Sequence, residues 1–124
     1  MKKRIIAVFT GNRAEYGLQV PILRAIDMHP KLEYRLIVSG AHLDKNFGQT
    51  VKEIESDGFK ISAEVKINMK KDNLFSTAQA IGNCVKETSK VLERINPNIF
   101  VVYADRFEGF AAIIAGTQMS IPTA

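Results

Sequence analysis

A glycine turn followed by a basic side chain is the first segment of the sequence that could bind an anion. It follows the apolar run 4–10: Gly11 allows the backbone to turn tightly, and Arg13 can bind a phosphate through two parallel hydrogen bonds. A helix that begins behind this turn would add free N–H groups and the positive end of its dipole. The segment is neither GxGxxG nor a Walker loop, so classical dinucleotide binding and P-loop chemistry are disfavoured. The alternative for Arg13 is a surface arginine without a ligand.

Asp105 and its neighbours form the segment best suited to proton transfer. After the apolar run 99–103, the sequence places the acid Asp105, the base Arg106, an aromatic residue and the acid Glu108. At the carboxyl end of a strand, Asp105 can act as an acid or a base, or accept a hydrogen bond from a substrate hydroxyl. Its structural alternative is to cap the helix that follows. Arg106 can bind a phosphate or pair with Glu108.

His42 and Cys84 also invite a chemical interpretation. His42 follows the apolar run 34–38, so it is either a polar contact to a ligand or a loop histidine that holds the local backbone. Cys84 is the single cysteine, which excludes an intramolecular disulfide, and its place beside an apolar helix stripe predicts inert core filling. The sequence has no CxxC and no histidine-rich pattern, and we therefore expect no metal site.

Alternating strands and helices must position these side chains. Apolar, β-branched runs predict strands, and apolar residues spaced by three and four predict helices. The expected strands are 4–10, 34–38, 60–67 and 99–103, with 121–124 beginning another, and the expected helices are 18–26, 50–58, 74–95 and 107–119. This alternation is typical of the doubly wound α/β class, in which helices cover both faces of a parallel sheet. Ligands in that class bind beyond the carboxyl ends of the strands, so the segments 11–16, 39–48 and 104–108 are expected to share one site.

Three local features of the helices carry more specific expectations. Pro21 is tolerated in the first helix if it falls within the first turn. Thr50 and Glu53 have the spacing of a capping box. In the long helix, one mostly apolar stripe is formed by Leu74, Ala78, Ile81, Val85, Thr88, Leu92 and Ile95.

The composition is that of one globular domain. Of the 124 residues, 46% are apolar and 24% are charged, which excludes a disordered or low-complexity chain. The net charge is +4, but the 17 basic residues are scattered, whereas nucleic-acid binders concentrate them on one face, so we expect no nucleic-acid partner. The apolar runs are far shorter than the ~18 residues that span a bilayer. The run 5–9 is also too short for the ~7–15 apolar residues of an export signal. We therefore expect no membrane partner and a cytoplasmic location.

Four blocks of the sequence, in order, resemble the hydrolysing UDP-N-acetylglucosamine 2-epimerases, which make the amino-sugar precursors of sialic and legionaminic acids. The blocks are 10–17 with Pro21-Ile22-Leu23, then 38–43, then 48–50 and 53–54 with Asp57-Gly58-Phe59, and finally Asp105-Arg106-Phe107-Glu108 with an alanine-rich helix and Ile121-Pro122. Each block alone is weakly specific, but together they cover essentially the whole chain.

The resemblance implies a fold and a reaction. Family members fold as two Rossmann-like domains that face each other across a cleft, as in glycosyltransferase-B enzymes, and residues 1–124 would be the doubly wound N-terminal domain. The second domain and an acidic segment that precedes it are absent from this sequence, so we expect these 124 residues to be inactive alone. The implied reaction eliminates UDP across C1–C2 of the sugar and then adds water, which leaves the C2-inverted free amino sugar. The implied partners are a UDP-sugar, the C-terminal domain of the same protein and further copies in a homo-oligomer; no cofactor is implied.

The resemblance also assigns roles to individual residues. Arg13 matches an arginine that contacts the nucleotide, and Asp105 matches an aspartate near the sugar, which makes it the catalytic candidate. Ala104 stands where many relatives have glycine; alanine displaces the loop only if that position has a positive φ. The remaining matched residues, expected to bind the substrate, are Gly11, His42, Arg106 and Glu108.

Two alternative functions stay open on the sequence. One is a non-catalytic α/β nucleotide-binding module of the receiver or flavodoxin type. A receiver would need acidic residues at the end of the first strand, where the sequence has Thr10-Gly11-Asn12-Arg13, and a flavin-binding loop rich in serine and threonine is also absent there. The other is a related nucleotide-sugar glycosyltransferase. Among epimerase substrates, UDP-N-acetylglucosamine and UDP-N,N'-diacetylbacillosamine are both candidates.

Overall fold

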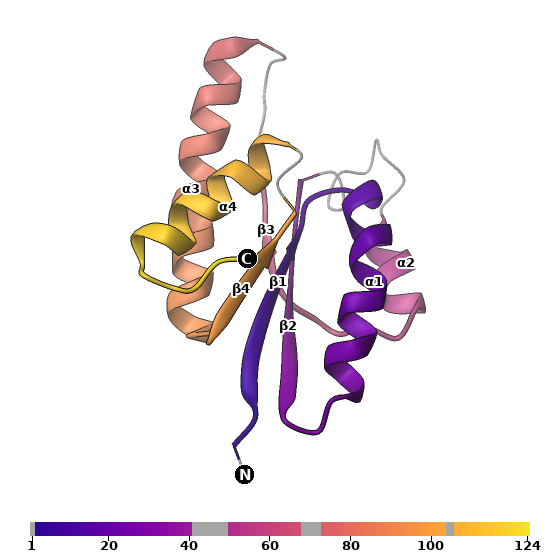
Figure 1. Ribbon diagram of the computed structural model, residues 1–124. Coiled ribbons are helices and arrows are strands. Elements are labelled where there is room, and N and C mark those ends of the chain that lie inside the picture. Colours follow the sequence, from indigo (N-terminus) through magenta and orange to yellow (C-terminus); the bar gives the residue numbers. More distant parts are fainter. Residues whose placement is uncertain (1, 41–49, 68–72, 104–105) are drawn as a thin grey trace.

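A four-stranded parallel sheet flanked by helices on both faces forms the protein (Figure 1). The structure, a computed structural model, describes residues 2–40, 50–67, 73–103 and 106–124. Its elements are β1 (Arg4–Thr10), α1 (Arg13–Met28), β2 (Leu32–Ser39), α2 (Val51–Ser56), β3 (Ile61–Val65), α3 (Leu74–Ile95), β4 (Ile99–Val102) and α4 (Phe107–Gln118). The doubly wound α/β fold expected from the alternation of strands and helices is confirmed.

The strand order is β3-β2-β1-β4, so the chain crosses from one edge of the sheet to the other between β3 and β4. All three strand pairs are parallel. On the outer side of β4, Thr123 forms a parallel bridge with Phe100, and the Phe100 N–H donates to the Pro122 carbonyl at 2.8 Å. The last residues therefore begin to pair as a further strand, as the sequence predicts.

Two apolar clusters hold the layers together, one on each face of the sheet. Alternate residues of β1 serve both clusters, because successive side chains of a strand point to opposite faces. Val8 packs in the cluster formed with α1 and α2, whereas Phe9 packs in the cluster formed with α3 and α4. In the second cluster, Phe9 and Phe100 meet edge to face with ring centroids 6.3 Å apart.

Two predictions about helix starts are wrong. Asn12 caps α1 and accepts a hydrogen bond from the Glu15 N–H at 3.0 Å, so the helix begins well before Pro21 and places that proline in its interior. Thr50 itself has helical backbone angles and makes no side-chain cap hydrogen bond, so the expected capping box with Glu53 does not form. A capping hydroxyl reaches the backbone only when its own residue is extended, and Thr50 is not.

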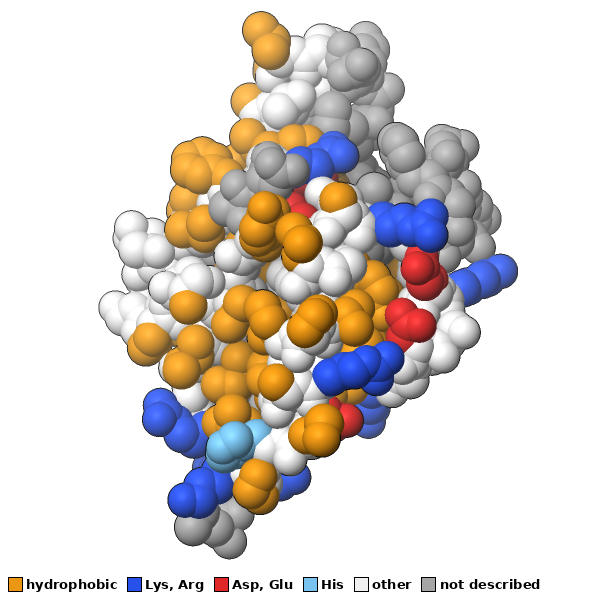
Figure 2. All heavy atoms as spheres, turned by 45° about the vertical axis from the view of Figure 1, so that its right-hand side comes forward, with side chains coloured by type: hydrophobic (Ala, Val, Ile, Leu, Met, Phe, Trp, Pro, Cys, Tyr) orange, Lys and Arg blue, Asp and Glu red, His pale blue; other side chains and the backbone are white. Residues whose placement is uncertain are grey.

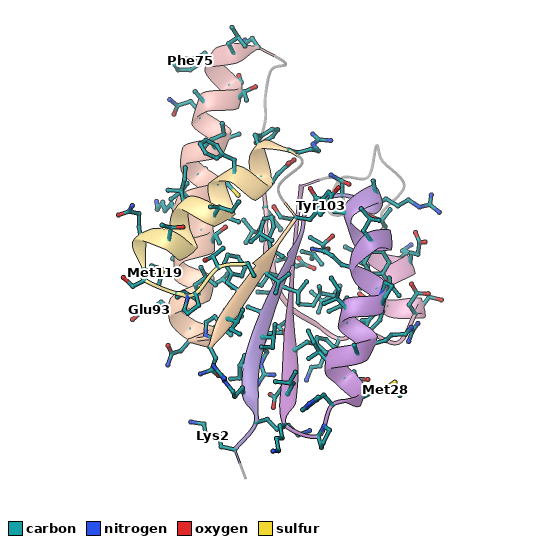
Figure 3. All side chains as sticks on the ribbon, viewed as in Figure 1. Lys2, Met28, Phe75, Glu93, Tyr103 and Met119 are labelled. Carbon is teal, nitrogen blue, oxygen red and sulfur yellow. The ribbon has the colours of Figure 1, made fainter. Side chains whose placement is uncertain are left out.

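The apolar stripe expected on the long helix is confirmed only over its later turns. The first turns of α3 project beyond the sheet, and Phe75 lies at their exposed tip (Figures 1 and 3). Leu74, the first residue of the expected stripe, is 89% exposed. The side of α3 that is buried consists of Ala80, Cys84, Thr88, Val91 and Leu92.

Two glycines in neighbouring helices are expected to respond oppositely to alanine. A Cβ at Gly116 of α4 would lie 2.9 Å from Phe100 Cδ2 and 2.8 Å from Thr123 Oγ1, whereas one at Gly82 of α3 meets nothing within 4 Å. We expect Gly116→Ala to lower the free energy of unfolding by about 1–3 kcal/mol through overpacking. Gly82→Ala should raise it by about 0.5–1 kcal/mol, because alanine is the better helix former. Urea unfolding measures both, and changes of the same sign would contradict the packing of α4 on β4.

The Tyr16 hydroxyl links α1 to the end of α2 by donating a hydrogen bond to the Asp57 carboxylate. Burial, followed by that hydrogen bond and the charge of Asp57, raises the pKa of Tyr16 above its ordinary value. Because folding raises the pKa of Tyr16, the protonated hydroxyl stabilises the fold at pH values below about 10, the pKa of tyrosine in an unfolded chain. This contribution is lost as the pH rises above about 10.

We therefore expect Tyr16→Phe to lower the free energy of unfolding by about 1–3 kcal/mol at neutral pH. The substitution should also reduce the loss of stability at alkaline pH. Urea unfolding near neutrality and above about pH 10 measures both effects. If Tyr16→Phe loses as much stability at alkaline pH as the unsubstituted protein does, another group is responsible for that loss.

Candidate functional site

The candidate site lies at the carboxyl ends of β1 and β4, where the chain leaves the sheet in two directions. From β1 it enters α1 on one face, and from β4 it enters α4 on the opposite face (Figure 1). Neighbouring parallel strands whose helices diverge in this way leave a crevice that binds ligands. The amino-terminal ends of both helices, whose first N–H groups have no partner within the helix, are at this same edge of the sheet.

The turn between β1 and α1 is held by two side chains of its own. Asn12 caps the helix, and the Glu15 carboxylate reaches back to accept the Gly11 N–H at 2.8 Å through Oε2. Glu15 is 1% exposed. Glu15 is not among the candidates expected from the sequence, although an asparagine N-cap followed three residues later by glutamate is a capping-box signal.

Two glycines let the β1 and β2 ends approach α4 closely. Gly40, directly after β2, has a φ of +61°, and a Cβ there would lie 2.7 Å from the Gly11 carbonyl oxygen and 3.0 Å from Glu108 Oε1. At Gly11, a Cβ would lie 3.3 Å from Glu15 Oε2 and 3.5 Å from Glu108 Cβ. Gly11 therefore lies where the backbone packs closely against two carboxylates, those of Glu15 and Glu108.

The start of α4 combines an open helix end with an arginine and a buried acid. Arg106 occupies the N-cap position and makes no side-chain cap hydrogen bond, so the first N–H groups are not covered by its side chain. Arg106 Nε lies 3.4 Å from Glu108 Oε2; the Arg106 side chain is 46% exposed and that of Glu108 is 3% exposed. The pairing with Glu108, one of the two alternatives for Arg106, is therefore present. An uncapped helix start beside a half-exposed guanidinium is suited to a phosphate.

Asp105 and His42, together with Ala104, lie outside the described residues. The structural alternative for Asp105 is to cap α4. The N-cap of α4 is instead Arg106, the residue that follows it. Tyr103 extends from the end of β4 at the same edge of the sheet and is 48% exposed (Figure 3).

Arg13 is at the opposite side of the crevice, in the first turn of α1. Its Nε lies 3.3 Å from Glu53 Oε2 of α2, with 74% of the arginine side chain exposed. An exposed pair of this kind contributes little to stability, so the guanidinium can exchange this partner for a ligand. On the face shown in Figure 2, blue and red side chains lie next to one another, and the described residues form no continuous basic surface there.

Cys84 is fully buried between α3 and α4, where its Sγ contacts Thr88 Oγ1 at 3.8 Å. Burial is the main cause that raises the pKa of this thiol, which makes it unreactive. Within the described parts of the chain, no three His, Cys, Asp or Glu side chains gather as metal ligands. None of the helices described is both long and apolar enough to cross a membrane.

A parallel sheet with glycine turns and two helix starts at its switch point, of which that of α4 has no side-chain cap, defines a Rossmann-like α/β domain, a class in which ligands bind at this point. Within that class the chain belongs to the UDP-N-acetylglucosamine 2-epimerase family, whose family model matches residues 24–124.

Individual relatives agree with this family. The chain is 34% identical over 122 residues to the hydrolysing UDP-N,N'-diacetylbacillosamine 2-epimerase of Legionella pneumophila. The matched region covers 98% of this chain and 32% of the Legionella protein. The chain is 31% identical to the hydrolysing GDP/UDP-N,N'-diacetylbacillosamine 2-epimerase of Campylobacter jejuni, over 98% of this chain and 32% of that protein. The chain thus spans about a third of the length of these relatives.

A solved structure shows the same fold. The UDP-N-acetylglucosamine 2-epimerase of Neisseria meningitidis bound to UDP-N-acetylglucosamine superimposes with a TM-score of 0.78 at 21% identity. The superposition covers 98% of this chain and 31% of the Neisseria chain. The Rossmann-like domain predicted from the sequence is therefore one that this larger epimerase also contains.

Proposed function

We propose that the chain is the N-terminal domain of a hydrolysing UDP-N-acetylhexosamine 2-epimerase that acts in the cytoplasm as a homo-oligomer. The observation that carries this proposal is the similarity, over 98% of the chain, to two proteins that are named hydrolysing 2-epimerases. The rest of the enzyme would be a second domain that closes the crevice from the other side. A cofactor is not needed for the reaction described below.

The proposed reaction has two steps. In the first, a base removes the proton from C2 of the sugar while the C1–O bond breaks, and UDP leaves with that electron pair to give a glycal. In the second, water adds across the double bond, with a proton at C2 and a hydroxyl at C1, and yields the C2-inverted free sugar. Such a reaction needs a positioned base and stabilisation of the leaving diphosphate.

The described part of the crevice supplies groups suited to the diphosphate. Arg106 and the uncapped start of α4 present a guanidinium and backbone N–H groups, and Arg13 presents a second guanidinium from α1. Positive groups at these places favour an anion through charge-assisted hydrogen bonds. Gly11 allows the ligand to approach the backbone. We assign the role of base near C2 to Asp105, and a polar substrate contact to His42.

Two UDP-sugars are candidate substrates. The Legionella and Campylobacter relatives are named for N,N'-diacetylbacillosamine, and the Neisseria structure holds UDP-N-acetylglucosamine. Comparing turnover of the two sugars by the full-length protein identifies the preferred one.

The proposal is tested by incubating the full-length protein with each UDP-sugar in D₂O and following the products by NMR. We expect UDP and the C2-inverted free sugar, with one deuterium at C2 because the glycal takes that atom from solvent. A UDP-linked epimer as the end product would contradict hydrolysis but keep the epimerase family. Binding of UDP-sugar without any turnover would favour the non-catalytic module. The 124 residues alone should release no UDP.

A further inference from the structure

We propose that Glu108 is a positioning residue that fixes the Arg106 guanidinium at the mouth of the crevice. This inference rests on the proposed function, in which Arg106 binds the diphosphate, and it adds how that side chain is held. It also separates Glu108 from the residues that touch the substrate themselves.

The burial of Glu108 argues against direct contact with a ligand. The residue is 2% exposed although it lies in the first turn of α4, beside a half-exposed arginine. Its Oε2 is buried and has no hydrogen-bond partner among the described residues, and its neighbour of opposite charge among them is Arg106 Nε at 3.4 Å. Burying a carboxylate is costly unless it is paired, and the charge of Arg106 offsets that cost here.

The surroundings of Glu108 leave its carboxylate little freedom to move. Its Oε1 lies against Gly40 and its Cβ against Gly11, so closely that a Cβ at Gly40 would come within 3.0 Å of Oε1. Gly40 also has a φ of +61°, a backbone conformation that residues with a side chain rarely adopt. The ends of β1 and β2 therefore form a wall that fixes the carboxylate, and the carboxylate in turn determines where Arg106 Nε lies.

The contact through Nε leaves the outer part of the guanidinium for a ligand. A guanidinium carries five N–H donors, of which Nε supplies one. The Arg106 Cζ lies 5.8 Å from the centroid of the Phe107 ring, which gives the arginine a second neighbour. By contrast, both members of the Arg13–Glu53 pair are exposed, at 74% and 42% of their side chains, so that pair has no fixed anchor. A long side chain held in advance loses less conformational entropy when it binds a ligand.

A double-mutant cycle in the full-length protein tests the proposal, with UDP affinity measured by titration calorimetry. The variants are Glu108→Gln, Arg106→Ala and the double variant. The matched control is Glu87→Gln, which removes a partly exposed acid paired with Lys90 on α3. We expect Arg106→Ala to weaken UDP binding about 10-fold or more, and Glu108→Gln about 3- to 10-fold. In the Arg106→Ala background, Glu108→Gln should have no further effect, since coupled residues are not additive. The control should bind as the unsubstituted protein does.

The sign of the Glu108→Gln effect is informative. Removing a negative charge beside an anion site would by itself strengthen UDP binding, whereas loss of positioning weakens it. Glu108→Asp keeps the charge but withdraws it from Arg106 by one methylene, so it should also weaken binding, and it replaces Gln in the cycle if Glu108→Gln fails to fold.

Three results would overturn the positioning role: tighter binding by Glu108→Gln, an equal loss in both Arg106 backgrounds, or no effect of Arg106→Ala. If the unsubstituted protein does not bind UDP, the proposed function itself fails. UDP binding that depends on Arg106 but not on Glu108 contradicts the positioning role alone.

Discussion

Replacing Asp105 with asparagine is expected to lower the turnover of the full-length protein about 100-fold or more while the protein still folds. Asparagine keeps the shape and polarity of the side chain but removes the charge and basicity that proton removal from C2 requires. Turnover is measured by the rate of UDP release from each candidate UDP-sugar.

The same substitution separates catalysis from helix capping. The N-cap of α4 is Arg106, so Asp105 precedes the capping position, and asparagine would in any case cap about as well as aspartate. A purely structural Asp105 would therefore give near-normal turnover in Asp105→Asn. The control is Asp27→Asn, an exposed aspartate near the end of α1, which should leave turnover unchanged.

Replacing Arg13 with alanine is expected to weaken UDP binding by about 1–3 kcal/mol, the size of a lost hydrogen bond to a charged group. Stability should hardly change, because the substitution removes only an exposed pair with Glu53. Titration calorimetry of the full-length protein measures the affinity, and urea unfolding measures the stability.

Arg94 provides the control for Arg13. It lies in the last turn of α3, which leads into the start of β4 and hence to the end of the sheet opposite the crevice. Arg94→Ala should not change UDP affinity. If the Arg13→Ala variant binds UDP as tightly as the Arg94→Ala variant, Arg13 is a surface arginine that does not contact the nucleotide.

Features that depend on neighbours in the sequence were predicted best. The bounds 74–95 of α3 agree with the apolar spacing and with the Asn96-Pro97 stop that follows it. The parallel direction of β1 and β4 followed from the alternation of strands and helices, whereas their being neighbours did not. The errors at Pro21 and Thr50 arise because a cap depends on backbone angles that residue types only partly determine.

Contacts between distant segments could not be predicted. The burial of Glu108 depends on Gly11 and Gly40, which reach it from the ends of two other strands. Its sequence neighbours, an arginine and an aromatic residue, are equally compatible with an exposed acid. The exposure of Leu74 has a similar cause, because helical spacing shows which residues share a face but not how far the helix extends beyond the sheet.

The most direct test of the account is a crystal structure of the full-length protein with a UDP-sugar bound. We predict that the diphosphate lies between the starts of α1 and α4, with the Arg106 guanidinium within hydrogen-bond distance of a phosphate oxygen, about 2.7–2.9 Å. The Asp105 carboxylate should lie within reach of C2 of the sugar. A UDP-sugar bound away from the carboxyl ends of β1 and β4, touching neither helix start, would contradict it.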